Sequence, residues 1–177
     1  MALTERQIDL IRDGVHKRER PSHAATIRGI DRVEISVEDG LHYRAREVDG
    51  QQTVMHIDEP PERGGQGTGN SPLGHFLTGA GACLLNQFVR IAIADGYDLT
   101  FSRARIRGEF SRDAGGAFER ITSEVYADGS LLAAAAERLT ERAESLCYVH
   151  NTLRRAVRMT TVLYLNGAEA VRRTSQP

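Results

Sequence analysis

The sequence predicts an α+β protein in which antiparallel sheets surround two central helices. The expected order is three strands, a helix, two strands, a helix and a strand. In several segments apolar and polar residues alternate with a period of two, which is typical of strands with one solvated face. Residues 72–95 and 130–147 instead carry apolar side chains at helical spacing. The alternating strands lack the continuous apolar runs of a parallel, doubly wound sheet, which favours α+β over α/β.

Size and composition indicate an ordinary soluble domain. The 177 residues are enough for one domain with a substantial core. Hydrophobic residues make up 40% of the chain and charged residues 27%, and the net charge of −1 gives no overall field that would attract nucleic acid or an anionic membrane. The N-terminus lacks the apolar core of a signal peptide, and no segment reaches the roughly 18 apolar residues of a membrane span. We therefore expect a cytoplasmic protein with no nucleic-acid or membrane partner.

Residues 1–20 predict an appended amphipathic helix. Thr4 and Gln7 stand at the spacing of a capping box, and Pro21 ends the segment. Ile8, Ile11 and Val15 follow the cap at helical spacing. Acidic residues interrupt the basic pattern, which disfavours a targeting helix. We expect this helix to pack on the rest of the protein.

The next segment, from His23 to Asp58, changes to a period of two. Valine and isoleucine alternate with polar residues at 33–37, and the letters EDG at 38–40 indicate a turn. Two more strands are expected at 41–48 and 53–58, on either side of a turn at 49–52. The three strands predict an antiparallel meander.

A glycine-rich loop follows at 60–70, with four glycines in eleven residues. It is expected to be too flexible to form a secondary-structure element. A phosphate-binding function is disfavoured because the loop lacks both the GK[ST] ending and the GxGxxG spacing. Its expected role is to let the chain wrap over the end of the next helix.

The first central helix starts with Ser71 as a cap and Pro72 at the first helical position, and it stops at Gly96. Its apolar residues cover most of the circumference, which predicts a buried, central helix: Phe76, Leu77, Leu84, Leu85, Phe88, Ile91 and Ile93. Gly79 and Gly81 lower helix propensity, so we expect another backbone to approach closely there.

The rest of the chain predicts two strands, helices and a last strand. Residues 99–112 alternate, with arginines on one face, and a turn at 113–117 leads into a returning strand. A helix is expected from Ser130, continuing or kinking into 148–157, and residues 160–165 form the last strand. We expect one domain over 21–167 and a flexible tail at 168–177.

The only two cysteines are Cys83, in the first central helix, and Cys147, at the end of the second. Structural disulfides are rare in the cytoplasm, so two such thiols are either inert core residues or redox and catalytic groups. Cys147 and His150 could share a helix face and bind zinc. No second ligand pair stands at a suitable spacing, so we expect no metal site. The chain has no GxSxG motif to support a serine hydrolase.

Two segments resemble the OsmC/Ohr (osmotically inducible protein C / organic hydroperoxide resistance) family. They are GGQGTGNSPLGHFLTGAGAC at 64–83 and AERLTERAESLCYVHNTLRRAVRMTTVL at 136–163. The shared features are a glycine-rich loop, a Ser-Pro helix start, a cysteine eleven residues after that proline, and a second cysteine in a C-x-x-x-N context. No single motif is diagnostic, but the two cysteines with their contexts and spacing are together fairly specific. The resemblance covers about residues 23–165.

The resemblance implies an OsmC-like fold and a tightly intertwined homodimer, with active sites at the subunit interface. It also implies a thiol-dependent peroxidase that reduces organic hydroperoxides. Cys83 would attack the O–O bond and become a sulfenic acid, and Cys147 would condense with it to form a disulfide. An external dithiol reductant, lipoyl-type in better-known members, would restore both thiols. No cofactor or metal is implied.

This chemistry needs a thiolate at Cys83, although burial disfavours the charged form of a thiol. The helix dipole acts only near the first turn, so a side-chain cation is needed. The resemblance implies an arginine from the early strands, and we prefer Arg44 over Arg46 by its spacing to the strand at 53–58.

The family holds this arginine with a glutamate directly after the helix-start proline, but here Leu73 occupies that position. His75 is a substitute close in sequence, and Glu59 or Glu62 could also orient an arginine. With Phe76 and Arg46, Leu73 and His75 are our candidates for substrate binding. The alternative function is a catalytically impaired dimer that holds a small hydrophobic ligand at its interface. A dimeric scaffold without a ligand is a third possibility.

Overall fold

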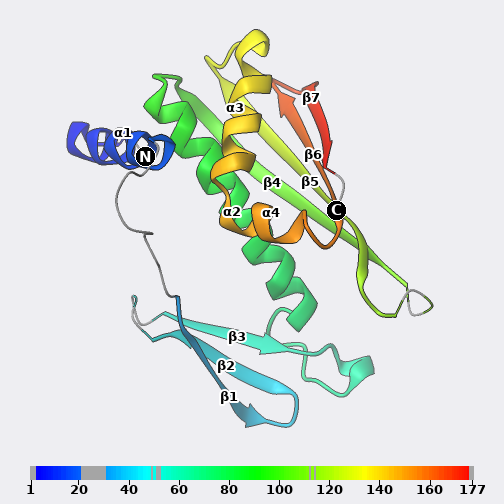
Figure 1. Cartoon of the computed structure of the whole chain (residues 1–177). Coiled ribbons are helices and arrows are strands. Elements are labelled where there is room, and N and C mark those ends of the chain that lie inside the picture. The colour runs from blue at the N-terminus through cyan, green and yellow to red at the C-terminus, as the bar shows by residue number, and fades with distance from the viewer. Residues whose placement is uncertain are drawn as a thin grey trace. The chain divides into compact units, whose positions relative to one another are not determined.

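The computed structural model describes residues 3–20, 31–48, 50, 53–111, 113 and 115–175. The chain divides into two compact units, one of residues 1–21 with 77–177 and one of residues 22–76. Figure 1 labels the elements, whose bounds are α1 Glu5–Glu19, β1 Val33–Asp39, β2 His42–Glu47, β3 Val54–Asp58, the 3₁₀ helix η1 Pro61–Arg63, α2 Pro72–Ala94, β4 Leu99–Phe110, β5 Phe118–Gly129, α3 Ala133–Leu146, α4 Tyr148–Leu153, β6 Arg158–Leu165 and β7 Ala168–Ser175.

The smaller unit contains the predicted antiparallel meander, in the order β1-β2-β3. Arg44 of β2 is opposite Ser36 of β1 and His56 of β3, so these residues share one polar face. The other face carries apolar residues such as Ile35, which is 61% exposed. Residues 23–30 of the predicted pattern, and most of the predicted turn at 49–52, lie outside the described residues.

The glycine-rich loop is ordered around Asp58, which corrects the expectation that it is too flexible to form an element. It contains η1, and Asn70 forms a bridge to Ile57 of β3. The Asp58 carboxylate accepts hydrogen bonds from the backbone N–H groups of Thr68 (2.9 Å) and Gln66 (3.1 Å), and from the Thr68 hydroxyl. Hydrogen bonding, chiefly from Thr68, holds the pKa of Asp58 below its ordinary value.

The glycines of this loop serve close packing. A Cβ atom on Gly65 would lie 1.7 Å from the backbone oxygen of Glu59, and one on Gly69 would lie 2.5 Å from that of His56. Any side chain at these two positions would therefore push the loop away from β3. The loop folds onto its own strand, which accounts for its composition without a phosphate ligand.

The larger unit contains a four-stranded sheet in the order β4-β5-β6-β7, with helices across one face (Figure 1). The sheet is mixed rather than antiparallel throughout, because the crossover through α3 and α4 brings β6 parallel to β5. The predicted flexible tail is wrong: residues 168–175 form β7, which pairs with β6. The strand at 160–165 is therefore not the last one.

The core of the larger unit lies between the helices and the sheet. It includes Leu84 and Phe88 of α2, Leu139 of α3 and Leu163 of β6. Val15 of α1 belongs to the same cluster and is buried, which confirms that the N-terminal helix packs on the protein. The capping box at the start of α1 is also present.

Helix α2 lies close to the sheet at Gly81, where a Cβ atom would lie 2.4 Å from Cγ1 of Ile106 in β4. The expected close approach at Gly81 is therefore made by a side chain and not by another backbone. At Gly79 no atom of the described residues, apart from the neighbouring helix backbone, lies within 4 Å of the same position. Helix α2 is therefore tightly packed at Gly81 and has open space at Gly79.

The 23 residues of α2 also correct the membrane expectation. By length and composition this helix is apolar enough to span a membrane, with a mean hydropathy of 1.4 over its most apolar 18 residues. A central core helix meets the same criterion, and Leu84, Phe88 and Ile91 of α2 are buried in the core described above. We therefore interpret α2 as the central helix of the fold.

The second central helix begins later than predicted. α3 starts at Ala133, whereas Ser130 exchanges hydrogen bonds with Asp98 at the start of the β4 region. The Ser130 hydroxyl accepts from the Asp98 N–H at 2.8 Å, so it is not available to cap the helix. Ser130 thus joins the ends of β4 and β5 instead.

Candidate functional site

The two cysteines meet in the larger unit. The sulfur of Cys147 lies 3.2 Å from that of Cys83 and is placed to donate its S–H to it. This separation is well beyond a disulfide bond of about 2.05 Å, and both thiols are free. Residues 64 positions apart are therefore in sulfur–sulfur contact.

Cys147 occupies a break between two helices. α3 ends at Leu146, Cys147 has an extended backbone with φ −83° and ψ 110°, and α4 begins at Tyr148. The Cys147 sulfur accepts the backbone N–H of His150 at 3.4 Å, as an N-cap does. Of the two predicted alternatives, a continuous helix or a kink, the structure shows a break at the cysteine itself.

The two thiols are in different environments. Cys147 is fully buried, and burial raises its pKa from 9.0 to about 12, against the smaller opposing effect of the His150 hydrogen bond. Cys83 is only partly buried. Cys147 therefore keeps its proton at neutral pH, and Cys83 is the thiol that a molecule from solvent can reach more readily.

His150 sits beside this pair but completes no metal site there. It is buried, and desolvation lowers the pKa of its imidazole, so the ring is neutral at pH 7. Among the described residues its Nδ1 has no hydrogen-bond partner. Within that same set, no third His, Cys, Asp or Glu joins Cys147 and His150 as a possible metal ligand. Sequence reasoning preferred a satisfied or exposed His150 over a zinc ligand, but it missed that the backbone N–H of His150 binds Cys147.

The two candidate arginines lie on the polar face of the smaller unit, and each has an acidic partner on β1. Arg44 Nε is 3.2 Å from Glu38 Oε1, and Arg46 Nε donates to Glu34 Oε2 at 2.8 Å. The carboxylate that holds Arg44 is thus Glu38, a residue that sequence reasoning did not consider. A register in which β1 and β2 pair around the turn at 38–40 would have placed it on the same face.

In the described part of the chain, neither Glu59 nor Glu62 forms an ion pair with these arginines. The Glu59 carboxylate instead lies 3.6 Å from the Arg63 guanidinium. The first turns of α2 carry the other candidates. Leu73 and Phe76 are 42% and 41% exposed. His75 is half-buried, and both of its ring nitrogens are buried without a hydrogen-bond partner among the described residues.

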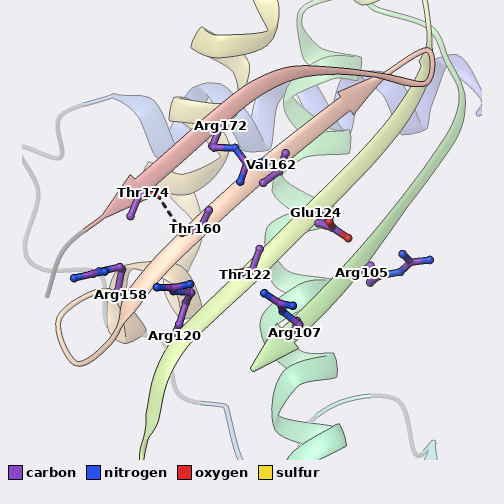
Figure 2. A pocket seen from close by; sticks show the side chains of 10 residues that line it. All are labelled: Arg105, Arg107, Arg120, Thr122, Glu124, Arg158, Thr160, Val162, Arg172 and Thr174. Carbon is purple, nitrogen blue, oxygen red and sulfur yellow. Dashed lines mark hydrogen bonds between the residues drawn. The ribbon is translucent and has the colours of Figure 1, made fainter. Parts of the chain in front are cut away.

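A separate hollow of about 580 Å³ lies on the face of the larger sheet that faces away from the helices (Figure 2). Its lining is polar, with ten residues: Arg105, Arg107, Arg120, Thr122, Glu124, Arg158, Thr160, Val162, Arg172 and Thr174. Three of the arginines are paired with acids, Arg107 and Arg120 with Glu109 and Arg172 with Glu169. The hollow contains neither cysteine and no extended apolar wall, so it is not the candidate site for thiol chemistry.

The fold and the site together define an α+β protein with a thiol pair, one thiol on the central helix and one in a helix break. The family model for OsmC-like proteins matches residues 65–162, more than half of the chain, and the chain belongs to this family. The match includes both cysteines. A search of curated proteins found no match.

Several solved structures share the fold at low sequence identity. An OsmC-like protein from Mycoplasma pneumoniae has a TM-score of 0.69 and 16% identity, covering 78% of this chain and 99% of that one. An organic hydroperoxide resistance protein OsmC from Legionella pneumophila, also described as a predicted redox protein, has a TM-score of 0.59 and 18% identity, with the same coverage. A candidate organic hydroperoxide resistance protein from Vibrio cholerae, with captopril bound in one active site, has a TM-score of 0.58 and 21% identity, covering 85% of this chain and 99% of that one.

The buried thiol predicts how stability depends on pH. Between about pH 9 and 12 the unfolded chain ionises Cys147 while the folded protein keeps it protonated. Its contribution is therefore fully present below pH 9 and is lost as pH rises toward 12, at up to about 1.4 kcal/mol per pH unit. The free energy of unfolding, measured by urea titration at about pH 8 and about pH 10, should fall more in the wild type than in Cys147→Ala. Equal falls in the two proteins would contradict the buried, protonated thiol.

Proposed function

We propose that this protein reduces organic hydroperoxides with Cys83 and Cys147 as its redox pair. The observation that carries the proposal is the 3.2 Å contact between the two sulfurs. Membership of the OsmC-like family supports it, as do structural relatives described as organic hydroperoxide resistance proteins. Two cysteines that served only as core filling would not need to face each other at this distance.

The proposed reaction has three steps. The Cys83 thiolate attacks the terminal oxygen of R–O–OH, the O–O bond breaks, and the alcohol R–OH leaves with a proton from solvent, so that Cys83 becomes a sulfenic acid. The Cys147 thiol then attacks the Cys83 sulfur, forming a disulfide and releasing water. Finally an external dithiol, of lipoyl type, is oxidised to its own disulfide and returns both cysteines to thiols.

The environments of the two thiols favour this assignment of roles. Cys147 is fully buried and its pKa is raised to about 12, so it is a poor nucleophile in the resting protein. Its S–H donates to Cys83, so the proton that Cys147 keeps is placed against the sulfur that must carry negative charge. Cys83 is the attacking thiol and Cys147 the resolving thiol.

Cys83 still needs a cation, and we propose that Arg44 supplies it. Glu38 binds Arg44 through one oxygen and can orient its guanidinium, the function that the family gives to the glutamate replaced here by Leu73. Glu38 lies on β1, two positions from Ser36, the residue opposite Arg44. The acid therefore comes from the sheet and not from the start of α2. This ion pair would take the place of the carboxylate that is absent at Leu73.

The substrate would lie at the start of α2. Leu73 and Phe76 offer exposed apolar surface for the organic group of a hydroperoxide. His75 has buried ring nitrogens without a described partner, and it can hydrogen-bond a peroxide oxygen. Arg46, on the same strand face as Arg44, is the fourth candidate contact.

The active unit is proposed to be a homodimer. Exposed apolar residues lie on β1, with Val33, Ile35 and Val37 each more than half exposed, and α2 leaves Gly79 open. An apolar strand face and an apolar helix of this kind are more often covered by a partner than left in water. A second copy of the chain is the partner that the family resemblance implies.

The exposed Leu73 and Phe76 also favour a second candidate function. A dimer without effective thiol chemistry could hold a small hydrophobic ligand there. Thiols that ignore hydroperoxide, together with a hydrophobic molecule carried through purification, would favour this candidate over the first.

The two cysteines should differ in how they react with a hydroperoxide. In the fully reduced wild type, one equivalent of cumene hydroperoxide should consume both thiols of each chain. Cys83→Ser should slow peroxide consumption on the order of 100-fold or more, because the attacking sulfur is gone. Cys147→Ser is the matched control: it should still consume one equivalent but stop at a sulfenic acid that a dimedone probe traps. If Cys83→Ser reacts as fast as the wild type, the assignment is wrong.

The role of Arg44 can be tested against its neighbour. Arg44→Gln should lower the rate of Cys83 oxidation about tenfold or more, the effect of losing about 1.4 kcal/mol of charge stabilisation. Arg46→Gln removes an equal charge from the same strand face and should have a smaller effect. Stopped-flow measurement of both variants decides the question, and equal rates in Arg44→Gln and the wild type would exclude Arg44 as the cation.

The proposed homodimer can be tested by the molecular mass of the protein in solution. Light scattering should give twice the 19.5 kDa of one chain. Ile35→Glu places a charge on the exposed apolar face of β1 and should shift the mass toward a single chain, because burying an unpaired charge is costly. Glu34→Gln, on the polar face of the same strand, should leave the dimer intact. A wild type that sediments as a single chain would contradict the proposal.

A further inference from the structure

Three potential metal ligands meet on the polar face of the smaller unit. Glu38 lies at the end of β1, His42 at the start of β2 and His56 within β3. The register shifts between Val37 and Asp39, so Glu38 sits in a β-bulge. Strand alternation puts Glu38 on the same face as Glu34 and Ser36, where His42 and His56 also lie.

The distances between these groups approach those of a coordinated ion. His42 Nε2 and His56 Nδ1 are 3.2 Å apart and share a hydrogen bond, which a bound ion would replace. Two nitrogens bound to one zinc ion at about 2.0–2.1 Å with a tetrahedral angle are about 3.3 Å apart. Glu38 Oε2 lies 3.9 Å from the same nitrogen of His56 and 3.7 Å from the other nitrogen of His42, Nδ1, and one of these two His42 nitrogens would bind the ion. One ligand atom from each residue lies within 4.8 Å of the others.

Only small side-chain movements separate this arrangement from a metal site. The two rings are nearly parallel, with planes 22° apart, so one must turn for both nitrogen lone pairs to point at the same ion. The His56 side chain is 51% exposed and has room to turn about its Cβ–Cγ bond, a torsion with broad preferences. The ligands are otherwise held by three neighbouring strands.

The surrounding charges are compatible with a cation. Arg44 binds Oε1 of Glu38, which leaves Oε2 directed toward the histidines. Asp58 is opposite His42 in the strand register and adds a second carboxylate at this end of the sheet. Glu38 and Asp58 together therefore outweigh the single charge of Arg44 near a divalent ion.

We propose that Glu38, His42 and His56 bind a divalent transition-metal ion of the zinc class. Two imidazoles and one carboxylate suit Zn²⁺ and its neighbours, whereas Ca²⁺ and Mg²⁺ prefer oxygen ligands alone. Three protein ligands leave at least one position for water or a small anion. The ion links β1, β2 and β3, so its binding stabilises the meander.

The experiment uses the full-length Cys83→Ser/Cys147→Ser protein without an affinity tag, so that no thiol binds the metal and the outcome is independent of the proposed peroxidase function. The protein is freed of metal with a chelator, then titrated with Zn²⁺ by calorimetry and with Co²⁺ by absorbance. The expected result is one ion per chain, with visible Co²⁺ bands and a higher midpoint of thermal unfolding.

Two variants make the test specific. His56→Gln replaces an exposed ligand and should lower the affinity for Zn²⁺ at least tenfold without loss of fold, as circular dichroism can check. His16→Gln, on α1, is the matched control and should bind as the parent does. Failure of the parent to bind Zn²⁺ more tightly than His56→Gln would overturn the proposal, as would loss of binding in His16→Gln.

Discussion

The close approach of α2 to the sheet is the constraint on which the thiol pair depends. Gly81 permits this approach, since a Cβ atom there would collide with Ile106. Overpacking at such a contact typically costs about 1–3 kcal/mol. Cys83 is two residues further along the same helix, so its position relative to the core is fixed by this packing. A helix displaced by a side chain at position 81 would carry the sulfur of Cys83 with it.

The second half of the pair is fixed by a helix break rather than by a helix. Cys147 ends α3, begins α4 and uses its sulfur to cap the second helix. The same features that fix it also bury it, and its raised pKa follows from that burial. The structure therefore gives the two cysteines unequal environments even though the sequence predicts both on helices. In the smaller unit Glu38 also has two contacts, because one carboxylate oxygen binds Arg44 and the other faces two histidines.

Much of the fold followed from local patterns. The alternation at 33–37 predicted β1, and the capping box predicted α1. The backbone approach expected at Gly79 and Gly81 is instead a side-chain contact with Ile106 at Gly81. β7 was missed because a short, charged edge strand has no apolar run to mark it. The parallel pairing of β5 and β6 was missed because strand direction depends on the crossover and not on the strands' own residues.

The candidate site was only partly predictable. Spacing and context identified Cys83 and Cys147, because family motifs carry them. The role of Glu38 depends on the pairing of β1 with β2, and that of the His150 N–H depends on a helix break; neither has a sequence signal as strong as a motif. The glycine-rich loop was misjudged as flexible because its glycines suggest mobility, whereas the buried carboxylate of Asp58 orders it. Long-range partners such as these become visible only when strands are in register.

Peptide mapping of the oxidised protein tests the central claim most directly. Reduced protein is treated with one equivalent of an organic hydroperoxide, blocked with an alkylating agent and digested without reductant. A single disulfide between Cys83 and Cys147 of the same chain is the predicted product, because their sulfurs are already in contact. Recovery of Cys147 as an alkylated thiol beside an over-oxidised Cys83, or a disulfide that joins two chains, would contradict the account.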